Sequence, residues 1–345
     1  GSELCRQVLS FQPAELILLD QSENGMFRIQ NELLPIAGPV KLRCVIADVC
    51  DAETIGTSMR ECQPDIVFHA AAYKHVPLME ENPRQAVNNN VIGTRTVADA
   101  AHECGVSRFV LISTDKAVRP SSVMGSTKLV AEKYLQARAL DSDTSYITVR
   151  FGNVLNSDGS VVPTFRSQIE AGGPLTVTHE EMRRFFMTIP EAVQLVLQAG
   201  ASGSSGDVLI LDMGEPIRIM DLARDMILLS GLRYPEDIDI EISGIRPGEK
   251  LVEELLYSSE QTSRRIHEKI YCSSRQAVLN LEQLDHEIRQ LSRAVDEGAE
   301  PARTALAALV AQLVELEDRV IEDPTFRAIG SEQPQTEPQP VRRAA

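Results

Sequence analysis

Three consecutive polar residues, Thr114, Asp115 and Lys116, follow the hydrophobic run "RFVLIS" and could carry out proton transfer. An aspartate and a lysine side by side can serve as acid and base when a dry pocket keeps the first protonated and the second neutral. Lys128 follows in "VMGSTK", and four positions before it stands Met124, whose thioether is of little use as a proton donor or acceptor. The alternative interpretation of Asp115 and Lys116 is an ion pair on a surface loop.

Strand and helix patterns alternate around these residues, which predicts a parallel sheet covered by helices. Hydrophobic runs typical of strands buried on both faces occupy residues 14–20, 41–49, 65–72, 108–114 and 145–154. A helical pattern over residues 82–105 ends at Gly105. The sequence therefore predicts an α/β, Rossmann-like doubly wound fold.

Several of the predicted strands end in residues suited to a dinucleotide. Asp20 could hold the adenosine ribose hydroxyls of NAD and repel the extra phosphate of NADP, or it could cap the next helix. Asp48 and Val49 end the following run, where a carboxylate and a backbone amide can bind adenine. Ala70 and Ala71 are small residues at a point where a strand must let a cofactor approach closely.

The first residues, "GSELCRQVLSF", have the pattern of an amphipathic helix with no strand before it. In a dinucleotide-binding fold, Gly1 would be the last glycine of the phosphate-binding turn. We therefore expect a fragment cut inside that loop, with a vacant position in the sheet, weak NAD(P) binding and marginal folding. The alternative is that Gly1 and Ser2 are a cloning scar, which still leaves the strand absent.

The composition is that of an ordinary globular protein, with 43% hydrophobic and 24% charged residues in a chain of 345. A net charge of -16 argues against a general nucleic-acid or membrane surface, and the lack of tryptophan argues against stacking platforms for single strands. The cysteines show no metal-ligand spacing and indicate reduced thiols in the cytoplasm: Cys5, Cys44, Cys50, Cys62, Cys104 and Cys272. We expect no metal site, and we expect no signal peptide or membrane span within the residues given.

The chain divides into four predicted parts. Residues 1–160 form an NAD(P)-binding domain, and residues 161–275 form mainly a smaller mixed α/β lobe that binds the substrate. Residues 276–322 are leucine- and alanine-rich helices on either side of Gly298, expected to pack against the body or a partner. Residues 323–345 are rich in proline and glutamine and are expected to be a disordered tail.

Seven segments together resemble the nucleotide-sugar 4,6-dehydratases of the extended short-chain dehydrogenase/reductase superfamily. They are "HAAAYKHVPLMEENP", "ISTDKAV", "VMGSTK", "RFGNVLNSDGSVVPTF", "MRRFFMTIPEA", "LDMGEPIRI" and "RPGEKLVEELL". The resemblance runs from Gly1 to about residue 260 and is strongest to the capsule and O-antigen group acting on UDP-N-acetylglucosamine. Methionine in place of the superfamily's tyrosine is typical of one branch of that group, whose members carry the domain behind an amino-terminal membrane region.

The resemblance implies a reaction with NAD or NADP that oxidises the sugar at C4, eliminates water across C5 and C6, and returns the hydride to C6. Asp115 would be the acid and Lys116 the base, with the hydroxyl of Thr114 beside the C4 oxygen. Lys128 would hold the nicotinamide ribose, and Met124 occupies the tyrosine position. The C4 hydroxyl proton could then pass from Thr114 to Lys128 through water or the ribose, or Asp115 could act twice.

The same resemblance implies the residues that bind the UDP-sugar. Asn153 would lie between nicotinamide and diphosphate, Arg184 and Arg246 would bind the diphosphate, and Glu249 would bind the uridine ribose. Lys74 is placed near the substrate. The implied enzyme is cytoplasmic or membrane-anchored through the missing amino-terminal region, makes a precursor of bacterial surface polysaccharide, and self-associates like its relatives.

Two other functions are compatible with this sequence. A UDP-hexose 4-epimerase has the same fold but depends on the tyrosine base and needs no acid–base pair at C5 and C6, so Met124 and the Asp115–Lys116 pair argue against it. A sugar-nucleotide binding module without catalysis would tolerate Met124 and would be indifferent to replacement of Lys116.

Overall fold

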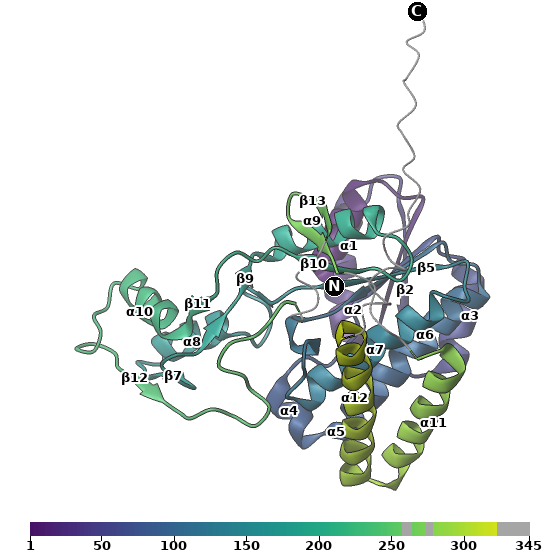
Figure 1. The fold of residues 1–345 in the computed structure, drawn as a ribbon. Helices are drawn as coiled ribbons and strands as arrows, with labels where there is room; N and C mark the ends of the chain where they lie inside the picture. Colours follow the sequence, from purple (N-terminus) through teal and green to yellow (C-terminus); the bar gives the residue numbers. More distant parts are fainter. Residues whose placement is uncertain (257–263, 274–278, 323–345) are drawn as a thin grey trace, which may run out of the picture.

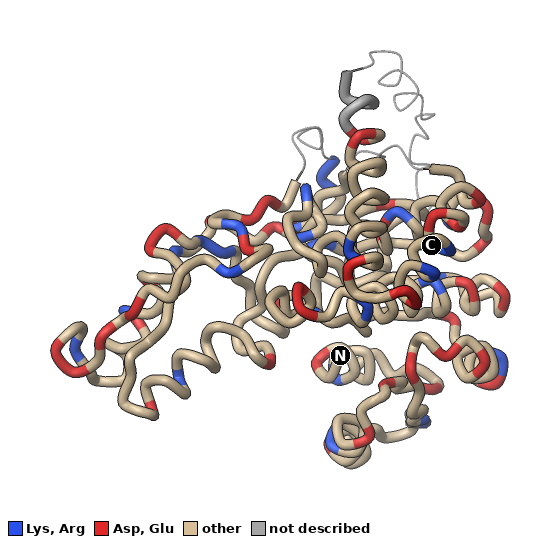
Figure 2. The backbone as a smooth tube through the Cα atoms, turned by 90° about the horizontal axis from the view of Figure 1, so that it is seen from below, with Lys and Arg blue, Asp and Glu red and all other residues tan. Residues whose placement is uncertain are grey.

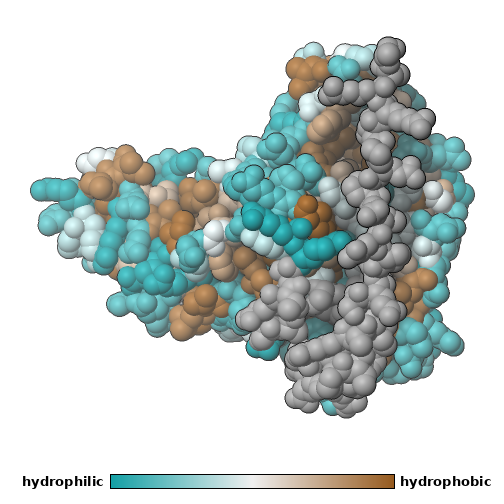
Figure 3. Space-filling model, turned by 45° about the horizontal axis from the view of Figure 1, so that its top comes forward, coloured by the Kyte–Doolittle hydropathy of each residue, from teal (hydrophilic) through white to brown (hydrophobic). Residues whose placement is uncertain are grey.

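The structure is a computed structural model and describes residues 1–256, 264–273 and 279–322. A body built on a parallel sheet carries a smaller lobe that projects to one side (Figure 1). The outline is concave where lobe and body meet (Figure 3). Three segments lie outside the described residues: 257–263, 274–278 and the predicted tail at 323–345.

The main sheet contains six strands in the order β13–β14–β10–β5–β4–β3. The four strands β10, β5, β4 and β3 run parallel, and β14 and β13 add an antiparallel edge next to β10. The predicted Rossmann-like parallel sheet is therefore confirmed, with two antiparallel strands that the sequence did not suggest. The bounds are Ile66–His69 (β3), Arg108–Ile112 (β4), Ser145–Arg150 (β5), Val208–Leu211 (β10), Arg264–His267 (β13) and Ile270–Cys272 (β14).

Alternation along β4 explains how helices cover both faces of this sheet. Successive side chains of a strand point to opposite faces, so Phe109 joins one apolar cluster and Val110 the other. The first cluster includes α6 (Thr94–Glu103) and α7 (Val123–Arg138), and the second includes α9 (Ile189–Ser202). Both faces of β4 and β5 are therefore buried, as the continuous apolar runs predict.

β1 (Glu15–Asp20) and β2 (Lys41–Ile46) form a separate two-stranded parallel sheet. Within the described residues β3 pairs with β4 alone, so no hydrogen-bonded ladder joins β1 to β3. The prediction of burial on both faces is wrong for β1 and β2, whose residues are mostly half-exposed. A two-stranded sheet offers little area, and its apolar residues pack mainly with α1 (Ser2–Ser10) and α2 (Glu23–Leu33) in a small cluster of their own.

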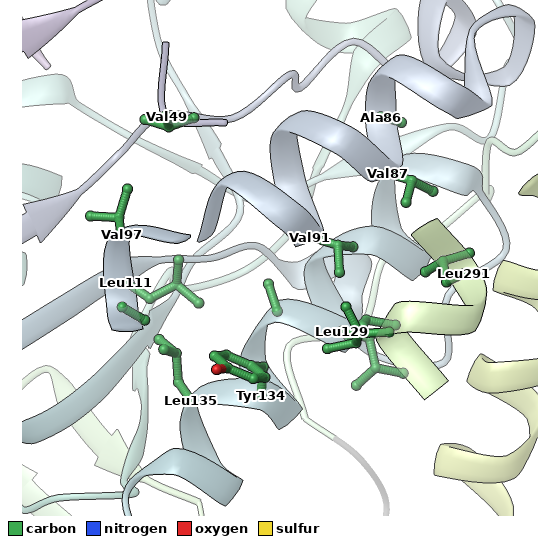
Figure 4. Packing of buried hydrophobic residues seen from close by; sticks show 14 of the residues in the cluster. Val49, Ala86, Val87, Val91, Val97, Leu111, Leu129, Tyr134, Leu135 and Leu291 are labelled. Carbon is green, nitrogen blue, oxygen red and sulfur yellow. The ribbon is translucent and has the colours of Figure 1, made fainter. Parts of the chain in front are cut away.

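Two long helices at the carboxyl end, α11 (Leu281–Glu297) and α12 (Ala299–Glu322), turn at Gly298 and pack against the body. Figure 4 shows Leu291 of α11 beside Leu129 of α7, with Val87 and Val91 close by. α7 lies between the sheet and this helical pair, which is why it is buried along nearly its whole length and has little amphipathic character. Its Lys133 is fully buried and forms an ion pair with Glu317 of α12.

The lobe has its own apolar cluster and is built from short strands and two helices. β7 pairs in parallel with β12, β8 pairs antiparallel with β11, and β6 pairs in parallel with β9. The bounds are Asn153–Val154 (β6), Val161–Glu170 (α8), Leu175–Val177 (β7), Arg183–Arg184 (β8), Phe186–Met187 (β9), Ile217–Arg218 (β11), Ile219–Leu229 (α10) and Ile240–Ile242 (β12). Acidic and basic residues are interspersed over lobe and body (Figure 2).

Several boundaries differ from the predicted ones. The helical pattern over 82–105 divides into two α-helices joined by a π-helical stretch, which keeps Asn90 fully buried. The run 41–49 leaves the sheet after Ile46, and the run 145–154 divides between β5 and β6. The remaining bounds are Leu34–Ile36 (η1), Ala52–Cys62 (α3), Val76–Glu81 (α4), Pro83–Val87 (α5), Asn88–Gly93 (η2) and Asp115–Ala117 (η3).

Among the helices that the structure describes, none combines the length and apolar character needed to cross a bilayer. The six cysteines are free thiols, five of them half-buried and Cys272 buried. In the same described part of the chain, no three His, Cys, Asp or Glu side chains are grouped so that they could hold a metal ion.

Candidate active site

The loop after β4 carries Thr114, Asp115 and Lys116 to the carboxyl edge of the main sheet. The backbone amide of Asp115 donates to the carbonyl of Phe151 at 3.1 Å, which holds this loop against the chain that leaves β5. Thr114 has an extended backbone and caps the single 3₁₀ turn of η3. The two strand ends therefore fix the loop at the edge where α/β proteins build their sites.

The carboxyl group of Asp115 is completely buried, with a side-chain exposure of 0%. Its Oδ1 accepts hydrogen bonds from the Thr114 hydroxyl at 2.8 Å and from Lys116 Nζ at 3.0 Å. Its Oδ2 is buried without a hydrogen-bond partner among the described residues. A Cβ at Gly152 would lie 3.1 Å from this oxygen, so glycine there keeps the approach open. A buried carboxyl oxygen without a partner is suited to meet a group of a bound molecule.

Lys116 lies at the centre of a mixed group of charges. Its Nζ is 3.1 Å from Asn153 Oδ1 and 3.9 Å from Glu253 Oε1, in addition to its bond to Asp115. Glu253 Oε1 is also 3.9 Å from Arg184 Nη2. The structure therefore brings Asp115 and Lys116 together with Asn153 and Arg184, two of the residues expected on the substrate side. The surface ion pair weighed from the sequence is wrong for Asp115, which is fully buried.

Lys128 and Met124 lie on the first turns of α7, which begins after Ser122, whose hydroxyl accepts from the Gly125 amide at 3.0 Å. Lys128 is 4% exposed, and its Nζ donates to the carbonyl of Ile112 at 2.7 Å. Burial lowers the pKa of Lys128 to about 8, although the Glu132 carboxylate acts in the opposite direction. Met124 is buried in the same apolar cluster as Leu129. The Thr114 hydroxyl bonds to Asp115, so the described geometry links it to the acid.

Apart from Gly1 and Lys128, the residues expected to hold a dinucleotide lie at or shortly after the carboxyl ends of β1, β2 and β3. Asp20 is exposed at the end of β1, and its Oδ1 accepts from the Ser22 amide at 2.8 Å. Asp48 is exposed and bonds to the Cys50 amide at 2.9 Å, while Val49 is buried. The sequence predicted that these two residues would end a strand. They lie instead in the turn after β2, because the chain leaves the sheet at Ile46.

Gly1 and the two alanines complete this part of the site. Gly1 is exposed and precedes α1 as its N-cap, with no atom within 4 Å of the position a Cβ would take. Ala70 is exposed and Ala71 half-buried in the segment after β3. Small residues and an exposed carboxylate at strand ends fit the adenosine and ribose of a dinucleotide.

The expected substrate residues differ in how far their side chains are exposed. Arg184 is 8% exposed on β8, and its Nη1 donates to the carbonyl of Leu251 at 3.1 Å. Arg246 is exposed, and its backbone amide lies 3.4 Å from the Glu249 carboxylate across one tight turn. Lys74 is exposed overall in the loop after β3, but desolvation of its ammonium group by nearby atoms lowers its pKa, and Asp158 opposes the shift.

Residues 246–253 form a segment that we call the strap, because it joins the lobe to the body across this site. In the body, Lys250 Nζ donates to the carbonyl of Val118 at 3.0 Å. In the lobe, the Arg183 amide donates to the carbonyl of Leu251 at 2.9 Å. Glu253 ends the strap and is 5% exposed. Arg246 and Glu249 of this segment were predicted from the sequence, and Glu253 was not.

A model of the family described as polysaccharide biosynthesis protein matches residues 1–275. The chain belongs to this family. A capsular polysaccharide biosynthesis protein, CapD, of Staphylococcus aureus is 56% identical over 273 residues, which are 79% of this chain and 45% of CapD. The chain thus spans about half the length of that relative.

Other relatives of the chain are named for reactions on nucleotide sugars. A UDP-N-acetylglucosamine 4,6-dehydratase (inverting) of Campylobacter jejuni is 33% identical over 269 residues, 77% of this chain and 76% of the relative. A UDP-glucose 4-epimerase of Rickettsia massiliae is 38% identical over 224 residues, 64% of this chain and 63% of the relative. The X-ray structure of Pen from Bacillus thuringiensis matches with a TM-score of 0.73 and 31% identity, over 84% of this chain and 94% of that one.

For this member of the family we predict weak binding of NAD. Asp20 ends β1 and Ala70 follows β3, and no ladder joins these strands in the described structure. Binding would therefore have to fix their relative position, and this ordering reduces affinity. Isothermal titration calorimetry should give a dissociation constant above about 100 µM. A constant near about 1 µM would contradict this account of the interrupted sheet.

Proposed function

We propose that the chain carries the catalytic site of a nucleotide-sugar 4,6-dehydratase that acts on UDP-N-acetylglucosamine for surface polysaccharide synthesis. The observation that carries this proposal is the Asp115–Lys116 pair, joined at 3.0 Å at the carboxyl edge of the sheet with an unpartnered oxygen on Asp115. Elimination across C5 and C6 needs both an acid and a base within reach of adjacent carbons. The name of the Campylobacter relative supports the same assignment.

In the proposed reaction Lys116, as the neutral amine, takes the C5 proton once C4 is a ketone. Asp115 gives a proton to the C6 hydroxyl, which leaves as water, and the resulting double bond receives hydride at C6 and a proton at C5. A nicotinamide dinucleotide, when bound, supplies the hydride acceptor and donor for this sequence. Because the Thr114 hydroxyl bonds to Asp115 Oδ1, Asp115 is also placed to receive the C4 hydroxyl proton through Thr114.

The remaining residues would hold the two ligands. The nicotinamide ribose of NAD or NADP would contact Lys128. The adenosine and diphosphate side would contact Gly1, Asp20, Asp48, Val49, Ala70 and Ala71. The UDP-sugar would be bound by Asn153, Arg184, Arg246, Glu249 and Lys74. An arginine suits a diphosphate because its guanidinium donates two parallel hydrogen bonds. Self-association and the downstream glycan remain predictions.

The test is a product analysis by proton NMR. The chain is incubated with UDP-N-acetylglucosamine and with NAD or NADP in excess over its dissociation constant. A new C6 methyl signal is expected, since the dehydratase converts a CH₂OH group into a methyl group. A C4 epimer with its C6 hydroxyl intact would support the epimerase instead, in line with the Rickettsia relative. Saturable UDP-sugar binding without any product would support a non-catalytic module.

A further inference from the structure

Glu253 is the one acidic side chain of the strap that lies buried against the acid–base pair. Its Oε1 is 3.9 Å from Lys116 Nζ in the body and 3.9 Å from Arg184 Nη2 in the lobe. A single carboxylate oxygen is thus shared between the proposed base and the arginine expected to meet the diphosphate. No part of the proposed reaction uses this residue.

The charges that face Glu253 come from three elements. Asp115 and Lys116 lie on the loop after β4, Arg184 lies on β8, and Lys250 lies on the strap itself. Burial raises the pKa of Glu253, and Asp115 acts in the same direction, while Lys116, Arg184 and Lys250 oppose the rise. Glu253 therefore takes up a proton more readily than an ordinary glutamate, and a further change in the surrounding charge can shift its pKa again.

A UDP-sugar would bring such a change, because its diphosphate carries two negative charges. If those charges bind at Arg184, the arginine no longer compensates the Glu253 carboxylate to the same extent. Two negative groups in a partly dry site favour uptake of a proton by the weaker acid. The diphosphate is the stronger acid, so the proton goes to the carboxylate.

We propose that Glu253 is a positioning residue that takes up a proton from solvent when the diphosphate of a UDP-sugar binds at Arg184. This inference rests on the proposed function, from which it takes the substrate class. Protonated Glu253 offsets part of the added negative charge, so that the diphosphate stabilises the ammonium form of Lys116 less than it would beside an ionised Glu253. The neutral amine that the C5 step requires therefore remains accessible after the substrate has bound.

The pH dependence of binding follows from this linkage. A ligand that raises the pKa of a carboxyl group binds most tightly below the free-state pKa, where the group is already protonated. Affinity then falls as pH rises through the free-state value and levels off above the bound-state value. Each unit by which the pKa rises weakens binding about tenfold between the two plateaus.

The experiment is calorimetric titration of the chain with UDP-N-acetylglucosamine, without dinucleotide, in buffers that differ in ionisation enthalpy. The slope of the observed heat against that enthalpy gives the number of protons taken up. The wild type should take up a proton over part of the range from about pH 5 to about pH 8.5, and its dissociation constant should rise with pH about tenfold. Glu253→Gln should take up none and show a nearly constant dissociation constant. Glu254→Gln, a change at the exposed neighbouring residue, should behave as the wild type.

The outcomes separate this inference from the proposed function. Binding of UDP-N-acetylglucosamine without proton uptake in the wild type would overturn the inference alone, whether or not any variant folds. Equal proton uptake by the wild type and Glu253→Gln would also overturn it, because another group would then be responsible. A complete lack of UDP-sugar binding would overturn the substrate assignment, and the inference would fall with it.

Discussion

Replacing Lys116 with alanine should lower the rate of dehydration between about a hundredfold and about ten-thousandfold, the range for loss of a general base. The reason is geometric, since Lys116 is held by Asp115 and Asn153 at the edge of the sheet where the C5 proton would be removed. Steady-state rates with UDP-N-acetylglucosamine measure the loss. Exchange of the C5 proton with solvent deuterium should disappear together with turnover.

A second variant distinguishes the base from a mere positive charge. Lys116→Arg keeps a cation beside the buried Asp115, but a guanidinium cannot give up its proton in a protein. It should therefore be as inactive as Lys116→Ala while unfolding at a temperature closer to that of the wild type. Lys41→Ala is the control, because Lys41 is an exposed lysine at the start of β2. A loss below about tenfold in Lys116→Arg would show that Lys116 is not the base.

Replacing Glu132 with glutamine should lower the free energy of unfolding by about 3–5 kcal/mol. Glu132 of α7 and Arg150 of β5 are both fully buried, and Arg150 Nη2 lies 2.6 Å from Glu132 Oε2. The Ser113 hydroxyl also donates to Glu132, so this pair supports the strand end that leads into the active loop. Removing one charge of a buried pair leaves the other in a medium of low polarity, which is costly.

Chemical denaturation measures this effect, with an exposed ion pair as the control. Asp237 accepts hydrogen bonds from the side chain of Arg233 at the surface, so Asp237→Asn should leave the free energy of unfolding nearly unchanged. Combining Glu132→Leu with Arg150→Met should cost less than Glu132→Gln alone, because neither charge of this pair is then left buried without its partner. A loss below about 1 kcal/mol for Glu132→Gln would show that the pair contributes little.

The sheet could be predicted from the sequence where strands are covered on both sides. β4 and β5 have continuous apolar runs because each face meets a different helical layer, and their positions agree with the predicted runs. β1 and β2 have equally apolar runs but form a small separate sheet, and composition alone does not reveal the extent of the covering surface. The edge strands β13 and β14 were missed because their short segments, Arg264–His267 and Ile270–Cys272, show no clear alternation.

The candidate site was predictable where its residues follow one strand. Asp115 and Lys116 come directly after β4, so sequence order alone places them at the carboxyl edge. Glu253 was missed because its position depends on how the strap crosses from the lobe to the body, a contact between segments more than 100 residues apart in the chain. The one local signal is an acid within the apolar stretch "LVEELL", and the neighbouring Glu254 carries the same signal although it is exposed.

The most direct test of the proposed chemistry uses UDP-N-acetylglucosamine that carries deuterium at C4. With NAD or NADP in excess, the proposal predicts that this deuterium appears in the new C6 methyl group and that a solvent proton enters at C5. Both positions can be read from the NMR spectrum of one product. Deuterium that remains at or returns to C4, with the C6 hydroxyl retained, would contradict the proposed dehydratase and would assign the Asp115–Lys116 pair to a different reaction.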